Sequence, residues 1–154
     1  MTGTVEIRKL KQQPVVSIRR TTTMAQLPTA FGEILPRVFQ ELQRRGVQPA
    51  GPPFGRYHSF SSDSIDLEAG LPVTEVPAVE APLQASALPA CEAAVLVHMG
   101  PYDNLKSTYD ALRRWFEENG REPGDGPWEY YVTDPMSEPD SSKWKTEVIW
   151  PFAP

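Results

Sequence analysis

The chain contains the stretch Gly51-Pro52-Pro53-Phe54-Gly55-Arg56-Tyr57, and its second half contains a related stretch, Gly126-Pro127-Trp128-Glu129-Tyr130-Tyr131. The second proline of the first stretch, its first aromatic residue and its last tyrosine all have counterparts at one constant separation. Each stretch opens with a glycine–proline turn signal and continues with alternating aromatic and polar residues, which predicts a turn followed by a β-strand. The ordered matches indicate two copies of one unit.

A helical pattern precedes each of these stretches. The first pattern forms one apolar stripe of Phe31, Ile34, Leu35, Val38, Phe39 and Leu42 and ends at Gly46. The second forms a stripe of Leu105, Tyr109, Leu112 and Phe116 and ends at Gly120. We expect Phe31, Phe39 and Phe116 to lie in the core. Pro36 lies inside the first pattern and cannot donate a backbone hydrogen bond, so we expect a kink or a frayed first half there.

The remaining segments have the pattern of β-strands. They are residues 15–20, 54–60, 66–71, 93–98, 128–133 and 145–150, together with 5–10 and 83–88, which each stand just before the first strand of a unit. The unit is thus β-β-α-β-β. We predict an α+β fold, a tandem pseudo-twofold repeat of β-β-α-β-β units with antiparallel sheets backed by two long helices and a ligand cleft between the repeats. Residues 1–154 form one domain, with repeat one at about 3–76 and repeat two at about 82–153.

Composition limits the function classes. The chain has 154 residues, 40% of them hydrophobic, and a net charge of −5, as expected of one globular domain. No apolar run is long enough to span a bilayer, and the single cysteine, Cys91, favours a reducing, cytoplasmic location. Basic residues occur as scattered pairs, so we expect no direct nucleic-acid binding and no membrane insertion. His58 and His98 lack metal-ligand spacing, and we expect neither a metal nor another cofactor.

Five motifs in order resemble the GyrI-like small-molecule-binding domains of the SOUL/GyrI superfamily. This family includes the effector-binding domains of AraC-type and MerR-type bacterial transcription activators. The motifs are Gly51–His58, Ile65–Val73, His98–Tyr102, Trp128–Pro135 and Thr146–Phe152. The resemblance implies a cleft for flat, hydrophobic and often cationic compounds, with Glu147 as the central acidic contact ringed by aromatic side chains. It also implies that some members act as hydrolases.

The residues themselves support a site around Glu147. This carboxylate lies in a strand of otherwise apolar residues, where lost hydration raises the pKa of a carboxyl group and favours a bound cation. The alternative is a solvated strand residue that faces Lys145 or Lys143. Glu68 is its repeat partner and is either a second cleft carboxylate or an exposed sheet residue, and Glu129 is a further candidate. The aromatic candidates on strands or at a helix entrance are Tyr57, Phe60, Tyr102, Trp128, Tyr131 and Trp150.

Three functions fit this sequence. The first is a binding protein that captures hydrophobic, aromatic or cationic compounds, with an acidic residue in a central cleft. The second is a hydrolase of cyclopropane-containing DNA-alkylating natural products, in which Glu147, helped by Glu129, activates water. The third is a regulatory protein with a protein partner, such as one that protects gyrase or acts with a separate transcription regulator.

Overall fold

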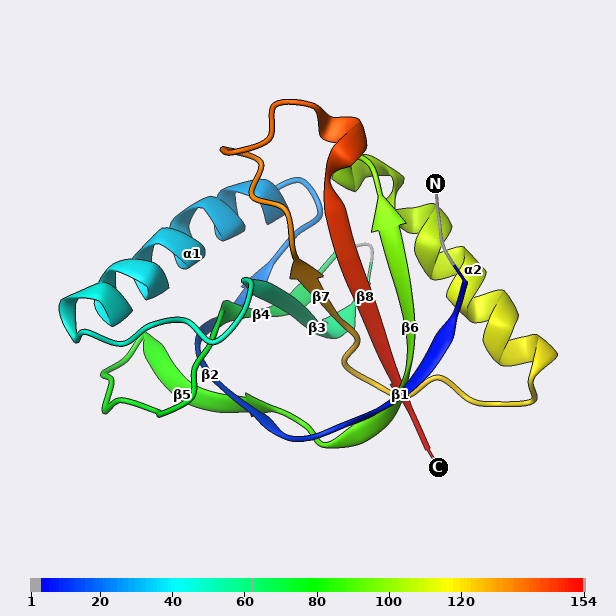
Figure 1. Ribbon diagram of the computed structural model, residues 1–154, viewed down its shortest axis with the longest axis horizontal. Coiled ribbons are helices and arrows are strands. Elements are labelled where there is room, and N and C mark those ends of the chain that lie inside the picture. Colours follow the sequence, from blue (N-terminus) through cyan, green and yellow to red (C-terminus); the bar gives the residue numbers. More distant parts are fainter. Residues whose placement is uncertain (1–3, 62, 154) are drawn as a thin grey trace. The chain divides into compact units, whose positions relative to one another are not determined.

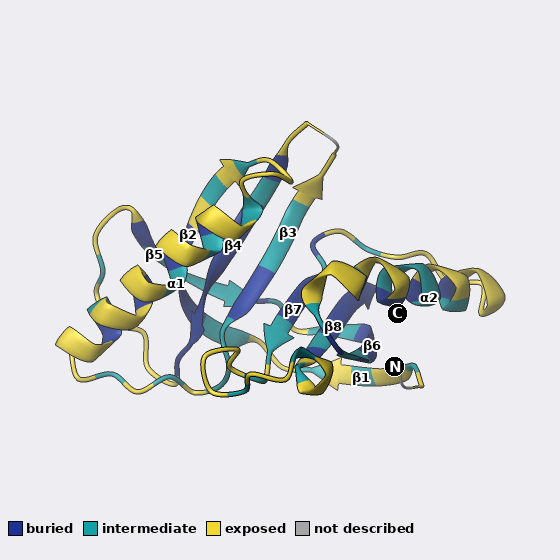
Figure 2. Cartoon of the chain, turned by 90° about the horizontal axis from the view of Figure 1, so that it is seen from above, coloured by how far each residue is buried: buried dark blue, intermediate teal, exposed yellow. Residues whose placement is uncertain are grey.

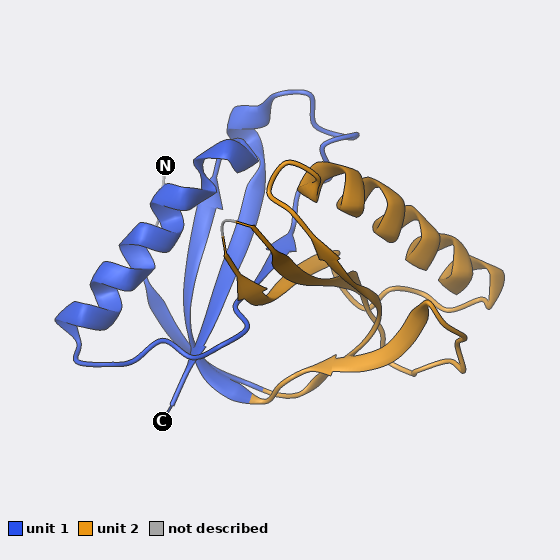
Figure 3. Cartoon of the chain, turned by 180° about the vertical axis from the view of Figure 1, so that it is seen from behind, with its two compact units in different colours: residues 1–10, 91–154 blue, residues 11–90 orange. Residues whose placement is uncertain are grey.

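The strands and helices of the computed structural model, which describes residues 4–61 and 63–153, divide into two units (Figures 1 and 3). Unit 1 consists of residues 1–10 and 91–154, and unit 2 of residues 11–90. Figure 3 draws unit 1 in blue and unit 2 in orange. Within the described residues, each unit contains four paired strands and one long helix.

Unit 2 is built from one continuous segment. Its elements are β2 (Gln13–Thr22), α1 (Leu27–Arg44), β3 (Phe54–Phe60), β4 (Ile65–Pro72) and β5 (Leu83–Leu88). The strands lie in the order β3-β4-β2-β5, and every pairing is antiparallel. The predicted strand from Phe54 to Phe60 and the predicted strand from Leu83 to Leu88 have these bounds in the structure.

Unit 1 combines the start of the chain with its second half. Its elements are β1 (Glu6–Leu10), β6 (Cys91–Met99), the short helix η1 (Tyr102–Asn104), α2 (Leu105–Glu118), β7 (Trp128–Tyr131), the short helix η2 (Ser141–Lys143) and β8 (Lys145–Phe152). The strand order is β1-β6-β8-β7, again with antiparallel pairs. The predicted α+β class with antiparallel strands backed by helices is confirmed.

The first strand of each sequence repeat pairs with the other repeat. β1 precedes β2 in the chain but pairs with β6, and β5 precedes β6 but pairs with β2. Each unit therefore takes its outer strand from the other half of the sequence. The predicted pseudo-twofold relation between the repeats stays a prediction.

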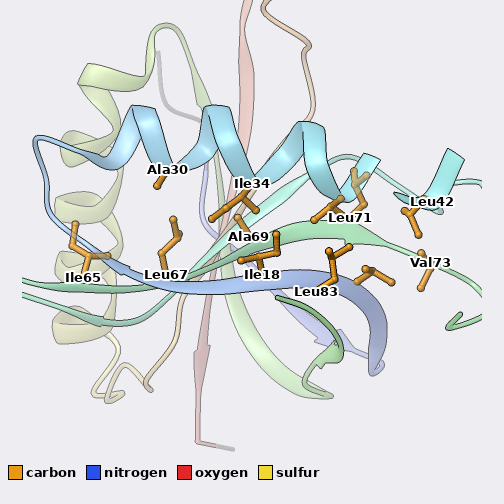
Figure 4. Packing of buried hydrophobic residues seen from close by; sticks show 12 residues of the cluster. Ile18, Ala30, Ile34, Leu42, Ile65, Leu67, Ala69, Leu71, Val73 and Leu83 are labelled. Carbon is orange, nitrogen blue, oxygen red and sulfur yellow. The ribbon is translucent and has the colours of Figure 1, made fainter. Parts of the chain in front are cut away.

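The core of unit 2 lies between α1 and its sheet. Ala30, Ile34, Val38 and Leu42 recur every four residues, so they share one helix face and are all buried. Figure 4 shows Ala30 and Ile34 pointing toward Leu67 and Ala69 of β4, on the face of the sheet that α1 covers. Each buried leucine or isoleucine contributes roughly 1.5–3 kcal/mol to folding.

Two expectations about α1 have different outcomes. The helix is continuous from Leu27 through Pro36, so its first half is not frayed, and the alternative of a kink at Pro36 stays a prediction. The expectation that Phe39 lies in the core is wrong. Phe39 is 49% exposed because it lies one residue beyond the buried Val38, on the flank of the apolar stripe. The solvent-facing side of α1 is accordingly coloured as exposed in Figure 2.

The core of unit 1 is richer in aromatic side chains. Phe116 of α2 packs edge-on against Trp150 and Phe152 of β8, with ring centroids 5.6 and 5.9 Å apart. Leu112 of α2 and Val148 of β8 complete the contact between helix and sheet. Because side chains alternate along a strand, the residues between these on β8 point to the face that α2 does not cover.

Neither α-helix in the described part of the chain is long and apolar enough to cross a membrane.

Candidate functional site

The most enclosed carboxylate of unit 1 is Glu129 on β7. Its side chain is 2% exposed, and it is paired with Val148, so it projects toward α2. The hydroxyl of Tyr109 on α2 donates to Oε2 at 2.6 Å, and the hydroxyl of Tyr131 donates to Oε1 at 2.7 Å. Two phenol groups thus hold the two oxygens of one buried carboxylate, and both bonds are short, as expected for a charged acceptor.

Aromatic rings continue from Tyr131 toward the surface. The ring of Tyr102 lies edge-on to that of Tyr131, with centroids 5.6 Å apart, and 5.2 Å from that of Trp144. Tyr102 is 36% exposed, whereas Tyr131 and Trp144 are half-buried. We name Glu129, Tyr102, Tyr109, Tyr131 and Trp144 the Glu129 cluster. It leads from solvent past edge-on and tilted aromatic rings to a buried acid.

The surroundings of Tyr102 raise the pKa of its hydroxyl. Burial raises the pKa of Tyr102 above its ordinary value of 10, and the negative charges of Asp134 and Glu129 raise it further. Tyr102 therefore stays protonated at neutral pH. It presents a neutral ring and a hydroxyl that can donate a hydrogen bond.

Glu147 lies on the opposite face of the same sheet. It is paired with Tyr130, while its neighbour Val148 packs against α2. The guanidinium of Arg8 on β1 lies 3.2 Å from its Oε1, and the Glu147 side chain is 20% exposed. The partner of Glu147 is thus an arginine from the outer strand, whereas the alternative interpretation from the sequence named Lys145 or Lys143.

The two tryptophan candidates also lie on different faces. Trp150 is on the helix side, where its ring packs edge-on against Tyr109 at 5.7 Å and its indole N–H donates to the carbonyl of Gly124 at 2.8 Å. The guanidinium of Arg113 covers that ring at 5.4 Å from the centroid. Trp128 is buried opposite Ile149 on the other face. Trp150 thereby joins the Glu129 cluster to the core of unit 1.

In unit 2, Glu68 is the centre of a polar network. It is 2% exposed, so the interpretation of Glu68 as an exposed sheet residue is wrong. Ser17 donates to its Oε2 at 2.7 Å, and Nε2 of His58 lies 2.7 Å from its Oε1. Burial alone raises the pKa of Glu68, but hydrogen bonds from Ser17, His58 and Ser86 and the charge of His58 outweigh it. The net pKa of Glu68 is therefore lowered.

The aromatic candidates of unit 2 have separate surroundings. Tyr57 packs partly buried against the α1 core, and Phe60 is exposed at the end of β3. Their rings meet edge-on with centroids 5.8 Å apart. Tyr57, Phe60 and Glu68 all belong to unit 2, and the predicted cleft between the repeats stays a prediction.

The structure therefore brings together three predicted residues, Glu129, Tyr102 and Tyr131. Sequence reasoning missed two members of the cluster. Tyr109 belongs to the apolar stripe of α2 and was expected only to pack there. Trp144 ends a polar loop, where no strand or helix pattern marked it. No group of three metal-binding side chains gathers within residues 4–61 and 63–153.

Comparison with known families identifies the class. The sequence model described as "GyrI-like small molecule binding domain" matches residues 3–153, almost the whole chain. The chain belongs to the GyrI-like family of small-molecule-binding domains. No curated protein sequence matches the chain significantly.

Solved structures share the fold. The crystal structure of the EcmrR C-terminal domain is similar with a TM-score of 0.86 and 24% identity, over 97% of this chain and 97% of that one. In the EcmrR–DNA complex the TM-score is 0.83 at 24% identity, and the match spans 97% of this chain but only 57% of that one. SAV2435 bound to tetraphenylphosphonium matches at 0.65 and 15% identity, covering 98% and 94% of the two chains.

A further similar structure carries an enzymatic description. It is a hydrolase encoded by lin2189 from Listeria innocua, with a TM-score of 0.70 and 12% identity, over 97% of this chain and 91% of that one. These structural likenesses show the shared fold.

Proposed function

We propose that this chain captures hydrophobic, aromatic or cationic small molecules at the Glu129 cluster, where Glu129 supplies the negative charge. One observation carries the proposal: a buried carboxylate is held by two tyrosine hydroxyls beside aromatic rings that pack edge-on and tilted against one another. A carboxylate in such surroundings has lost most of its hydration, so attraction to a cation is weakly screened.

The aromatic members of the cluster suit the apolar part of such a ligand. Ring faces attract cations within about 6 Å and stack on flat apolar surfaces. Tyr102 is the most exposed member of the cluster, so it is placed to meet an entering compound first. The tetraphenylphosphonium complex of SAV2435 supports the choice of a bulky aromatic cation as the probe.

Glu147 is the alternative acidic contact. The Arg8 guanidinium already balances its charge at 3.2 Å, so a cationic ligand there must displace an ion pair. Displacing that ion pair would cost a cationic ligand part of its binding free energy. We favour Glu129 because the rings of Tyr102, Tyr131 and Trp144 lie next to one another beside it, and we keep Glu147, with Trp128 on its face, as the second position.

Titration with tetraphenylphosphonium tests the proposal. Isothermal calorimetry on the wild type, Glu129→Gln and Glu147→Gln, with melting temperatures as the folding control, separates the two carboxylates. We expect Glu129→Gln to weaken binding by about 1–3 kcal/mol, or roughly 5- to 150-fold, and Glu147→Gln to change it little. The reverse order would move the site to Glu147. A wild type that binds neither this cation nor a flat cationic dye would remove the proposal.

A hydrolase is the second candidate, because a carboxylate and tyrosine hydroxyls lie together at Glu129. A carboxylate can take a proton from water while a tyrosine hydroxyl polarises the reacting group. In a cyclopropane substrate, the water oxygen would bond to a ring carbon as one ring C–C bond breaks. The electron pair would pass to the conjugated carbonyl, which then takes a proton. Incubation with such an alkylating compound should give a product heavier by one water, lost in Glu129→Gln.

A regulatory role with a protein partner is the third candidate. The chain matches 57% of EcmrR in its DNA complex, which is compatible with a domain that acts beside a separate regulatory part. The matching strand orders of the two units support a pseudo-twofold duplication. A cytoplasmic location stays a prediction.

A further inference from the structure

His98 joins β6 to two other segments of unit 1. It is almost fully buried, and both of its ring nitrogens have partners. Nδ1 lies 2.8 Å from the hydroxyl oxygen of Thr108 on α2, and Nε2 lies 2.9 Å from the backbone carbonyl of Pro101. Because a carbonyl only accepts, Nε2 carries the proton, and in the neutral ring the Thr108 hydroxyl donates to Nδ1.

The carbonyl that His98 holds belongs to the turn that carries Tyr102. Gly100 in this turn has φ of 124°, a backbone conformation that favours glycine. Its N–H donates to the carbonyl of Trp144 at 2.8 Å. The Gly100–Pro101 segment is thus fixed on one side by Trp144 and on the other by His98, immediately before Tyr102.

The same segment sets the position of two rings of the Glu129 cluster. Tyr102 follows Pro101 directly and lies 5.2 Å from the Trp144 ring and 5.6 Å from the Tyr131 ring. The indole N–H of Trp144 donates to the carbonyl of Glu138 at 2.8 Å, which anchors Trp144 to its own loop. A shift of the turn at Pro101 would therefore separate Tyr102 from both rings.

We propose that His98 is a positioning residue: by donating from Nε2 to the Pro101 carbonyl, it holds Tyr102 against Trp144 and Tyr131 as the outer wall of the ligand site. This inference rests on the proposed function for its effect on binding. Its effect on the rings is independent of any ligand.

Two substitutions separate the two hydrogen bonds of His98. In His98→Gln the side-chain amide nitrogen reaches about as far as Nε2, so the bond to Pro101 is kept. In His98→Asn the amide reaches only about as far as Nδ1, so Thr108 is still contacted but Pro101 is not. We expect nuclear Overhauser effects between the Tyr102 and Trp144 rings in the wild type and His98→Gln, and their loss in His98→Asn. Their survival in a folded His98→Asn would overturn the inference.

Binding of tetraphenylphosphonium supplies the second readout. We expect His98→Asn and Tyr102→Ala each to weaken it by about 3- to 10-fold, and the double variant to bind no worse than Tyr102→Ala alone. If the binding losses of the two single variants multiply in the double variant, His98 acts by a route other than Tyr102, and the proposal is overturned.

The wild type provides a measurement that needs no variant. We expect nitrogen-15 spectra of the His98 imidazole at neutral pH to show the proton on Nε2. A proton on Nδ1 alone would overturn the inference, even if His98→Asn does not fold. If the wild type does not bind tetraphenylphosphonium, the proposed function fails, while the ring contacts and the tautomer still decide the role of His98.

Discussion

Glu129 and Glu147 lie on two strands that pair with each other, yet their side chains leave the sheet of unit 1 on opposite faces. The register sets this, since Glu129 is opposite Val148 and Glu147 is opposite Tyr130. An acid–base pair needs both groups beside one substrate. Glu129 and Glu147 therefore do not form such a pair in unit 1, and each carboxylate acts on the face of the sheet where it lies.

Replacing Glu129 should alter the titration of Tyr102. The negative charge of Glu129 contributes to the raised pKa of the Tyr102 phenol, after burial and together with Asp134. We expect Glu129→Gln to lower the Tyr102 pKa while leaving it above 10, because burial remains. Titration of ring carbon-13 signals between pH 8 and 12 (roughly the range in which tyrosine ionises) measures this. An unchanged or higher pKa would contradict the placement of Tyr102 beside Glu129.

The ion pair between Arg8 and Glu147 should contribute modestly to stability. Both side chains are partly exposed, so we expect Glu147→Gln to lower the free energy of unfolding by less than about 1 kcal/mol. The loss should be smaller still in 1 M salt, where charges are screened over about 3 Å. Urea unfolding at low and high salt measures the difference. Glu6→Gln is the matched control, since Glu6 contacts the same guanidinium from a more exposed position. A loss of several kcal/mol that salt does not reduce would contradict this account.

Glu68 should make the stability of the protein depend on pH. Its pKa in the folded state is below the ordinary 4.5, so its stabilising effect is complete above that value and is lost as pH falls through the folded-state pKa. We expect the difference in unfolding free energy between wild type and Glu68→Gln to be largest near neutral pH and to shrink in acid. Unfolding curves at several pH values test this. A difference that grows toward low pH would show the opposite shift.

Two glycines should respond in opposite ways to alanine. A methyl group on Gly70 of β4 would lie 2.0 Å from the carbonyl oxygen of Val16 and 2.7 Å from the Cα of Ser17, so the paired strand β2 must move. We expect Gly70→Ala to lower the free energy of unfolding by about 1–3 kcal/mol or more. Gly32 of α1 has open space, and Gly32→Ala should stabilise by up to about 1 kcal/mol. Equal melting temperatures for the two variants would refute this contrast.

Local patterns predicted the elements well. The apolar spacing in α1 and α2 and the alternation around Phe54 and Trp128 are short-range signals, and the corresponding helices and strands are present. Phe39 differed because the six-residue apolar stripe is wider than the helix face that the sheet covers. The pairing of β1 with β6 was not predictable, since neither Glu6–Leu10 nor Leu83–Leu88 carries a sequence feature that marks which strand it will join.

The candidate site was only partly predictable. Tyr102, Glu129 and Tyr131 stand in recognisable motifs, but whether Glu129 or Glu147 faces the helix depends on the register of β7 against β8. Arg8, Tyr109 and Trp144 come from distant segments, and only the tertiary fold shows that Arg8 balances Glu147. Sequence reasoning ranked Glu147 above Glu129 on the family resemblance and on the apolar strand around Glu147, and that ranking stays a prediction.

The origin of β1 in the first ten residues has a practical consequence for handling the protein. Trimming this short leading segment would damage the C-terminal half of the molecule, because it would strip β6 of one hydrogen-bonding neighbour and Glu147 of its arginine. Cutting the gene between the sequence repeats would likewise leave each fragment holding a strand that belongs to the other. A rearranged chain could start at Lys11 and carry residues 1–10 on a linker behind residue 154. In that chain, one continuous segment of sequence would contain all the strands of each unit.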